Sequence, residues 1–113
     1  MFIILLDEPG LFVFDSAEAA VRDIEPIDAE SEIRAAFDES GTPYKVDWLR
    51  PNKHRKALFG LLKSIEPGEY RFVPAGPPEP QSLAELIRLH PEASTPPEAG
   101  PALNALLGSL SAV

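Results

Sequence analysis

Thirteen prolines divide this chain of 113 residues into short segments. Proline lacks a backbone N–H and clashes with the preceding helical turn, so a helix ends at or before it. We therefore expect helices to stop at Pro26, Pro67 and Pro91. Eight of the prolines lie between Pro74 and Pro101, which marks the C-terminal third as a stiff extension that is folded only in pieces. A chain this short has one core and forms one domain.

The beginning of the chain predicts a β-hairpin. Two apolar runs, 2–6 and 11–14, flank Asp7-Glu8-Pro9-Gly10, in which proline and glycine supply turn geometry. The first run has five apolar residues, whereas a signal peptide needs about 7 to 15 and a membrane span about 20. We interpret the run as a buried strand, and we expect a cytoplasmic protein that does not bind a membrane.

A helix is predicted next. Residues 15–18 have the pattern of a capping box, in which Asp15 accepts hydrogen bonds from the first-turn amides and Glu18 reaches back. The apolar residues that follow recur at helical spacing and form one stripe. They are Ala17, Ala20, Val21 and Ile24. Pro26 then prevents the helix from continuing.

From Glu30 to Arg50 the apolar period changes to two, which predicts strands. Residues 39–42, in the middle of this stretch, can turn the chain. We therefore expect a second β-hairpin here, with Trp48 in the core. Residues 70–73 predict one more short strand.

Three further helices are predicted. One spans about residues 57–65 and is capped by Asn52. The next follows Ser82, and residues 91–100 then form an exposed linker. The last begins at Pro101 and carries a leucine stripe that must pack on its own domain or on another chain. The stripe consists of Leu103, Leu106, Leu107 and Leu110.

These elements predict an α+β fold. We expect a mainly antiparallel sheet of about five strands with helices packed against it, followed by a Pro-rich C-terminal extension that ends in a helix. The predicted division is a core domain of residues 1–76 and a helical extension of residues 77–113, packed on the core or on a partner.

Negative charge is concentrated in the first half of the chain. Residues 1–50 hold twelve acidic and four basic residues, whereas the rest of the chain holds six of each, so the first segment accounts for the formal net charge of −8. The negative electrostatic field of such a segment favours encounter with a basic partner and disfavours binding to nucleic acid or to an anionic membrane.

Five carboxylates crowd the passage from the first helix to the next strand. They are Asp23, Glu25, Asp28, Glu30 and Glu32. Like charges repel within a Debye length of about 8 Å, so this crowding lowers stability unless a cationic partner relieves it. The alternative is an ordinary solvated surface that serves solubility.

The sequence contains no signature of an enzyme or a metal site. It has no cysteine, and His54 and His90 each lack a second ligand at helical spacing. No serine lies in a nucleophile elbow, and the glycine patterns that bind phosphates or dinucleotides are absent. We therefore expect no catalytic residue, no metal and no cofactor. The absence of cysteine is compatible with a reducing cytoplasm.

One basic cluster follows the acidic half of the chain. Its members are Arg50, Lys53, His54, Arg55 and Lys56. They form either a solvated turn that pairs with the protein's own acidic surface or a contact site for an anion or an acidic partner. RNA binding through this cluster is opposed by the overall negative charge.

Three segments carry a family resemblance. They are Phe12–Ala20, the I-E-x-I-D junction Ile24–Asp28, and the F-D-x-x-G hairpin Ala36–Tyr44. In these segments the chain resembles small acidic bacterial immunity proteins that are encoded beside polymorphic toxins. The resemblance covers about residues 11–50 and implies a protein that binds a cognate toxin and blocks it, without enzymatic activity.

The resemblance implies inhibition by occlusion of a basic active-site cleft on the toxin. Carboxylates would steer the two proteins together, and aromatic or apolar anchors would slow their dissociation. We predict eight partner-binding residues, most of them acidic. They are Asp23, Glu25, Asp28, Glu30, Glu32, Asp38, Glu39 and Tyr44.

Two other interpretations are compatible with the sequence. The first is an adaptor or regulatory domain that binds a protein partner through the C-terminal leucine stripe. The second is a small enzyme or ligand-binding protein, which would require a polar pocket that the sequence does not indicate.

Overall fold

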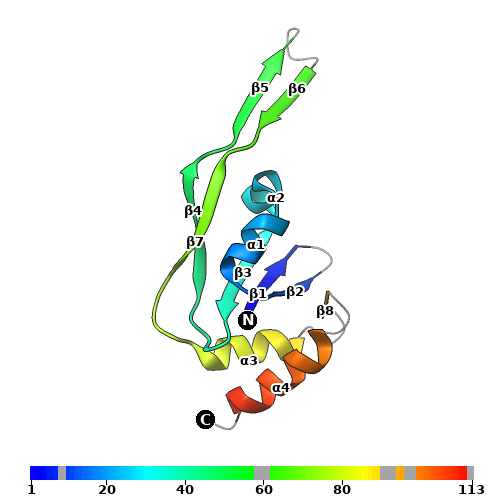
Figure 1. Ribbon diagram of the computed structural model, residues 1–113, viewed down its shortest axis with the longest axis vertical. Coiled ribbons are helices and arrows are strands. Elements are labelled where there is room, and N and C mark those ends of the chain that lie inside the picture. Colours follow the sequence, from blue (N-terminus) through cyan, green and yellow to red (C-terminus); the bar gives the residue numbers. More distant parts are fainter. Residues whose placement is uncertain (8–9, 58–61, 90–93, 96–98, 112–113) are drawn as a thin grey trace.

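The computed structural model describes residues 1–7, 10–57, 62–89, 94–95 and 99–111 (Figure 1). Its larger sheet is built around an antiparallel hairpin of β1 (Phe2–Leu6) and β2 (Leu11–Phe14). β3 (Ile33–Asp38) pairs antiparallel with the other edge of β1, and β8 (Ser94–Thr95) lies parallel to β2. The first predicted hairpin and the α+β fold class are therefore confirmed.

α1 (Ala17–Asp23) forms where it was predicted, but its cap lies one residue later. The hydroxyl of Ser16, and not the carboxylate of Asp15, accepts a hydrogen bond from the backbone N–H of Ala19 at 3.1 Å. Ser16 has the extended backbone of an N-cap, with φ −154° and ψ 168°, which aims its hydroxyl at the first-turn amides. The predicted stripe packs in the core as expected. It consists of Ala17, Ala20, Val21 and Ile24.

A second short helix, α2 (Pro26–Ser31), replaces the strand predicted from Glu30. Pro26 occupies the first position of this helix, where the N–H that proline lacks would have no intrahelical acceptor. The period of two begins only at Ile33, in β3. Proline thus ends one helix and starts the next, because the rule against proline holds for a helix interior and not for its first turn.

β4 (Tyr44–Arg50) does not form the second predicted hairpin. It pairs antiparallel with β7 (Glu69–Pro74), the strand predicted near residues 70–73. In the described chain no strand ladder joins β3 to β4; one isolated β-bridge links Phe37 of β3 to Pro43, the residue before β4. The turn before β4 contains Gly41 at φ 87°, a conformation that favours glycine. The strands are thus distributed over a four-stranded sheet and two two-stranded sheets.

β5 (Lys53–Ala57) and β6 (Leu62–Glu66) form an antiparallel hairpin in place of the helix predicted over about residues 57–65. Figure 1 shows that this hairpin, which we call the arm, continues the direction of β4 and β7 and projects beyond the rest of the molecule. The pairing between β4 and β7 brings β5 and β6 together. This tertiary context overrides the helical spacing of the apolar residues between positions 57 and 65.

Asn52 does not cap a helix; its side chain is buried where the arm begins. Its carbonyl oxygen accepts a hydrogen bond from the backbone N–H of Gly68 at 2.8 Å, and its amide nitrogen donates to the carbonyl of Pro26 at 2.8 Å. The amide therefore fastens the base of the arm to the start of α2.

α3 (Pro80–Leu89) and α4 (Ala99–Ser111) confirm the two predicted C-terminal helices, each of which starts earlier than expected. Most of the predicted linker lies outside the described residues. The leucine stripe of α4 packs on its own domain: Leu103 and Leu110 are buried, and the two leucines between them are partly buried.

The larger sheet has an apolar cluster on each face. Side chains alternate along a strand, so Phe2 and Ile4 enter one cluster and Ile3 enters the other. The first cluster joins the sheet to α1, α2 and β7, and Trp48 is partly buried against it. The second cluster joins the sheet to α3 and α4.

Candidate partner-binding site

A pocket of about 360 Å³ lies between the α1–α2 segment and the β1–β2 hairpin. Its walls combine apolar side chains of the hairpin and α1 cap with acidic side chains of α1 and α2. The lining residues are Leu6, Phe12, Val13, Phe14, Asp23, Ile24, Asp28 and Glu32. The pocket therefore has an apolar interior and three carboxylates.

Two aromatic rings line the pocket on the β2 side. Phe12 and Phe14 are two residues apart on one strand, so they share a face of the sheet. Their rings are nearly parallel, with centroids 6.5 Å apart and planes inclined by 18°. Phe14 packs against the first core cluster, whereas Phe12 belongs to neither cluster although it is half-buried. Phe12 is thus an aromatic side chain that the core does not use.

The three carboxylates come from different positions on two short helices. Asp23 ends α1, Asp28 lies in the first turn of α2, and Glu32 is the C-cap of α2. No basic side chain in the described part of the chain forms an ion pair with any of them. No ion pair within the described part of the chain therefore neutralises the negative charge at the pocket.

Two of these carboxylates are unfavourably placed for the helices themselves. The C-terminal end of a helix carries a partial negative charge, so an exposed carboxylate there costs a few tenths of a kcal/mol. Asp23 and Glu32 both occupy such ends, whereas Asp28 is at a favourable N-terminal position. A cation in the pocket would offset this cost.

The junction between α1 and α2 is held by Tyr70 of β7. The hydroxyl of Tyr70 donates a hydrogen bond to the carbonyl of Ile24 at 2.6 Å. Burial raises the pKa of Tyr70 to about 12, and the negative charge of Asp28 acts in the same direction. Tyr70 is therefore protonated at neutral pH, and it fixes the backbone from which two of the pocket carboxylates extend.

The other predicted carboxylates of this segment lie beside the pocket without lining it. Glu25 is the exposed N-cap residue of α2. The carboxylate of Glu30 lies 2.9 Å from Nε2 of His54 on the arm. Arg50, at the end of β4, is 3.5 Å from Glu69. Two members of the basic cluster thus contact acidic residues of the same chain, as the first interpretation expected, but they lie on β4 and β5 and not in a turn.

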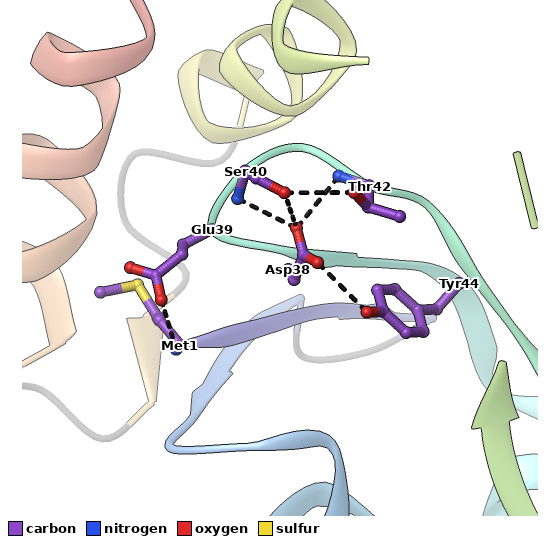
Figure 2. A network of polar contacts seen from close by, with 6 residues as sticks. All are labelled: Met1, Asp38, Glu39, Ser40, Thr42 and Tyr44. Carbon is purple, nitrogen blue, oxygen red and sulfur yellow. Dashed lines mark hydrogen bonds and ion pairs between the residues drawn. The ribbon is translucent and has the colours of Figure 1, made fainter. Parts of the chain in front are cut away.

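The remaining predicted residues form a separate network at the turn after β3 (Figure 2). One Asp38 oxygen accepts hydrogen bonds from the backbone N–H and hydroxyl of Ser40, at 2.9 and 2.6 Å, and from the backbone N–H of Thr42, at 3.1 Å. The other oxygen accepts from the hydroxyl of Tyr44 at 3.1 Å. Glu39 forms an ion pair with the amino group of Met1 at 3.3 Å.

This network changes the titration of its members. Partial burial by itself raises the pKa of Asp38, but the hydrogen bonds from Ser40, Thr42 and Tyr44 outweigh it and leave that pKa below its ordinary value. Burial raises the pKa of Tyr44, and its hydrogen bond to Asp38 adds to this effect. The carboxylate of Asp38 thus acts as an internal acceptor that shapes the turn.

The structure therefore does not bring all eight predicted residues together. β3 separates the pocket from the turn by six residues, which corresponds to about 20 Å of extended chain. The pocket is lined by Asp23, Asp28 and Glu32, whereas Asp38 and Tyr44 bind each other at the far end of the strand. Phe12 and Phe14 were not among the predicted site residues; their spacing of two, beside the acidic segment, was the available signal.

The described part of the chain shows no other feature of a specific chemistry. It contains no group of three or more potential ligands placed to hold a metal ion. None of its helices has the length and apolar content needed to cross a membrane. His90 lies outside the described residues.

The chain was compared with protein-family models, curated proteins and solved structures. No family model, no curated protein and no solved structure matches it. The function must therefore be argued from the pocket and its charges.

Proposed function

We propose that this protein is an immunity protein, which binds a cognate bacterial toxin and blocks it by covering a basic active-site cleft. The observation that carries the proposal is the acidic pocket surface of α1 and α2. Three carboxylates without an ion-pair partner in the described chain surround an apolar pocket lined by two phenylalanines. The contact surface is the pocket together with the flanking Glu25 and Glu30.

Such a surface supports binding of a basic protein for two physical reasons. The carboxylates raise the rate of encounter with a positively charged cleft, because they act over a distance set by the ionic strength. The apolar pocket accepts an anchor side chain, and buried anchors slow dissociation. A surface with both properties suits an inhibitor that must find its target quickly and stay bound.

The adaptor function through the leucine stripe of α4 has less support. Leu103 and Leu110 are only 4% and 5% exposed, because they pack against the sheet and α3. A partner could use this stripe only after α4 had left its own core. The acidic pocket requires no such rearrangement.

A cytoplasmic location is part of the proposal. A chain without cysteine needs no disulfide for its stability, so it is compatible with a reducing compartment. An immunity protein there would meet the toxin where the toxin acts on the cell.

Co-expression tests the proposal directly. The partner is first captured with the tagged protein from its own bacterium and identified by mass spectrometry, and is then expressed alone or together with this chain. We expect the partner to stop growth by itself and growth to be restored by co-expression. The variant carrying Asp23→Asn, Asp28→Asn and Glu32→Gln should protect less, whereas Glu85→Gln, an exposed carboxylate on α3, should protect fully. No captured toxin, or no protection, would overturn the proposal.

A further inference from the structure

We propose that the pocket receives one arginine side chain from the partner. This inference rests on the proposed function and deepens it, because it names the residue type that the acidic pocket surface recognises. Three properties of the pocket lead to it: its size, its aromatic wall and its unpaired carboxylates.

The pocket has the size for one long side chain. Its volume of about 360 Å³ is at the lower end of the range of about 300–1,000 Å³ found for ligand pockets. The apolar lining residues Leu6, Ile24 and Phe14 can cover a hydrocarbon stem of several methylene groups. An acidic or short polar side chain would leave this lining uncovered.

The aromatic wall favours a flat cation. A guanidinium is planar and less strongly hydrated than an ammonium, and it stacks on aromatic rings. Phe12 presents a half-buried ring that packs in neither core cluster, and the ring of Phe14 is nearly parallel to it. A guanidinium that covered the Phe12 ring would remove from water the one aromatic side chain of β2 that the fold leaves outside its core.

The carboxylates supply the matching charge. Asp23, Asp28 and Glu32 line one pocket, and in the described part of the chain none of them has an ion-pair partner. A guanidinium has five N–H donors in a fixed fork, so it can bind carboxylates from both helices at once. Lysine offers a compact, strongly hydrated charge that matches this arrangement less well.

Side-chain analogues provide a test that needs no toxin. The full chain, labelled with ¹⁵N, is titrated with N-acetyl-arginine methylamide, with its lysine counterpart and with its citrulline counterpart, in which an uncharged urea replaces the guanidinium. We expect saturable shifts of the amide signals of Val13, Ile24 and Asp28 with the arginine compound, with a dissociation constant on the order of millimolar. The lysine compound should bind several-fold more weakly, and the citrulline compound should give no saturable shift.

Matched variants locate the binding. Asp28→Asn and Phe12→Ala should each weaken binding of the arginine compound about five- to tenfold, because one removes a charge from the pocket and the other removes its aromatic wall. Glu85→Gln removes a negative charge from an exposed position on α3 that does not line the pocket, so it should change binding less than twofold. Thermal unfolding by circular dichroism checks that each variant is folded. If the Phe12→Ala variant is unfolded, the Asp28→Asn variant alone tests the location of binding.

Several results would overturn the inference. One is the absence of saturable shifts with the arginine compound, and another is equal binding of the lysine or citrulline compound. A third is an effect of Glu85→Gln as large as that of Asp28→Asn, since this would show a general charge effect. A fourth is self-association by light scattering that Asp28→Asn abolishes, because the pocket would then hold a second copy of the chain.

The outcome can be separated from that of the proposed function. If the arginine compound binds in the pocket but co-expression gives no protection, the immunity function is wrong although the preference of the pocket is correct. If protection is observed and the arginine compound does not bind, the function stands and the arginine assignment is wrong.

Discussion

The protein has two acidic regions that use their carboxylates in opposite ways. At the turn after β3, both oxygens of Asp38 accept hydrogen bonds from the same chain. At the pocket, Asp23, Asp28 and Glu32 have no ion-pair partner in the described chain, and two of them occupy helix ends that disfavour negative charge. Internally satisfied carboxylates stabilise a fold, whereas unsatisfied ones are available to another molecule.

The largest expected effect is a loss of stability at the turn. Asp38→Ala removes the acceptor of four hydrogen bonds, so it should lower the free energy of unfolding by about 2 kcal/mol. The neighbouring Glu39→Ala removes only an exposed ion pair and should cost less than about 0.5 kcal/mol. Urea denaturation of both variants measures this. Equal losses would mean that the Asp38 network does not hold the turn.

The second difference is in association. Neutralising all three pocket carboxylates, by Asp23→Asn, Asp28→Asn and Glu32→Gln, should slow binding to the captured partner about tenfold at low salt and flatten its salt dependence. Stopped-flow or surface-binding kinetics measures the rate. Asp47→Asn, a carboxylate on β4 that pairs with Arg71, is the control. An unchanged association rate in the triple variant would place the contact surface elsewhere.

The third difference is in pH dependence. Hydrogen bonds lower the pKa of Asp38 in the folded state, so its contribution to stability is present above its ordinary pKa, near 4, and is lost as the pH falls through the lower folded-state value. Asp38→Asn should therefore reduce the loss of stability between pH 6 and pH 2.5. Asp28→Asn serves as the comparison from the pocket. Denaturation curves at both pH values measure the effect. If Asp38→Asn left the pH dependence of stability unchanged, Asp38 would not be the source of that dependence.

The smallest expected effect has the opposite sign. Glu32→Gln removes a negative charge from the C-terminal end of α2, so it should raise the free energy of unfolding by a few tenths of a kcal/mol at low ionic strength. The gain should shrink in high salt. Thermal unfolding in low and high salt measures it. A loss of stability would show that Glu32 is satisfied within the fold, and the contrast between the two regions would then weaken.

The sequence predicted the elements whose information is local. The β1–β2 hairpin, α1, α3 and α4 follow from apolar spacing and turn residues, and they form as expected. The second hairpin and the helix over residues 57–65 were wrong because β4 pairs with β7, a strand about 25 residues away in the sequence. That pairing depends on tertiary contacts which no local pattern contains.

Only part of the candidate site was predicted, because the rest of it also depends on tertiary contacts. The acidic segment containing Asp23, Asp28 and Glu32 was visible in the charge distribution, and these three residues do line one pocket. The contribution of Phe12 and Phe14 depends on how the α1–α2 segment packs on the β1–β2 hairpin. Charge can be counted along a chain, whereas a cavity exists only after distant segments have packed.

The β1–β2 hairpin packs on both of its faces, which has a practical consequence for any attempt to make a shorter version of this protein. The hairpin whose β2 strand bears the pocket phenylalanines also carries Ile3 and Leu11, which pack in the second cluster together with residues of α3 and α4. Trimming the polypeptide after residue 76 would expose those side chains to water and remove the support behind the aromatic wall. A minimal version must therefore retain both layers or replace the lost one with a new apolar cover.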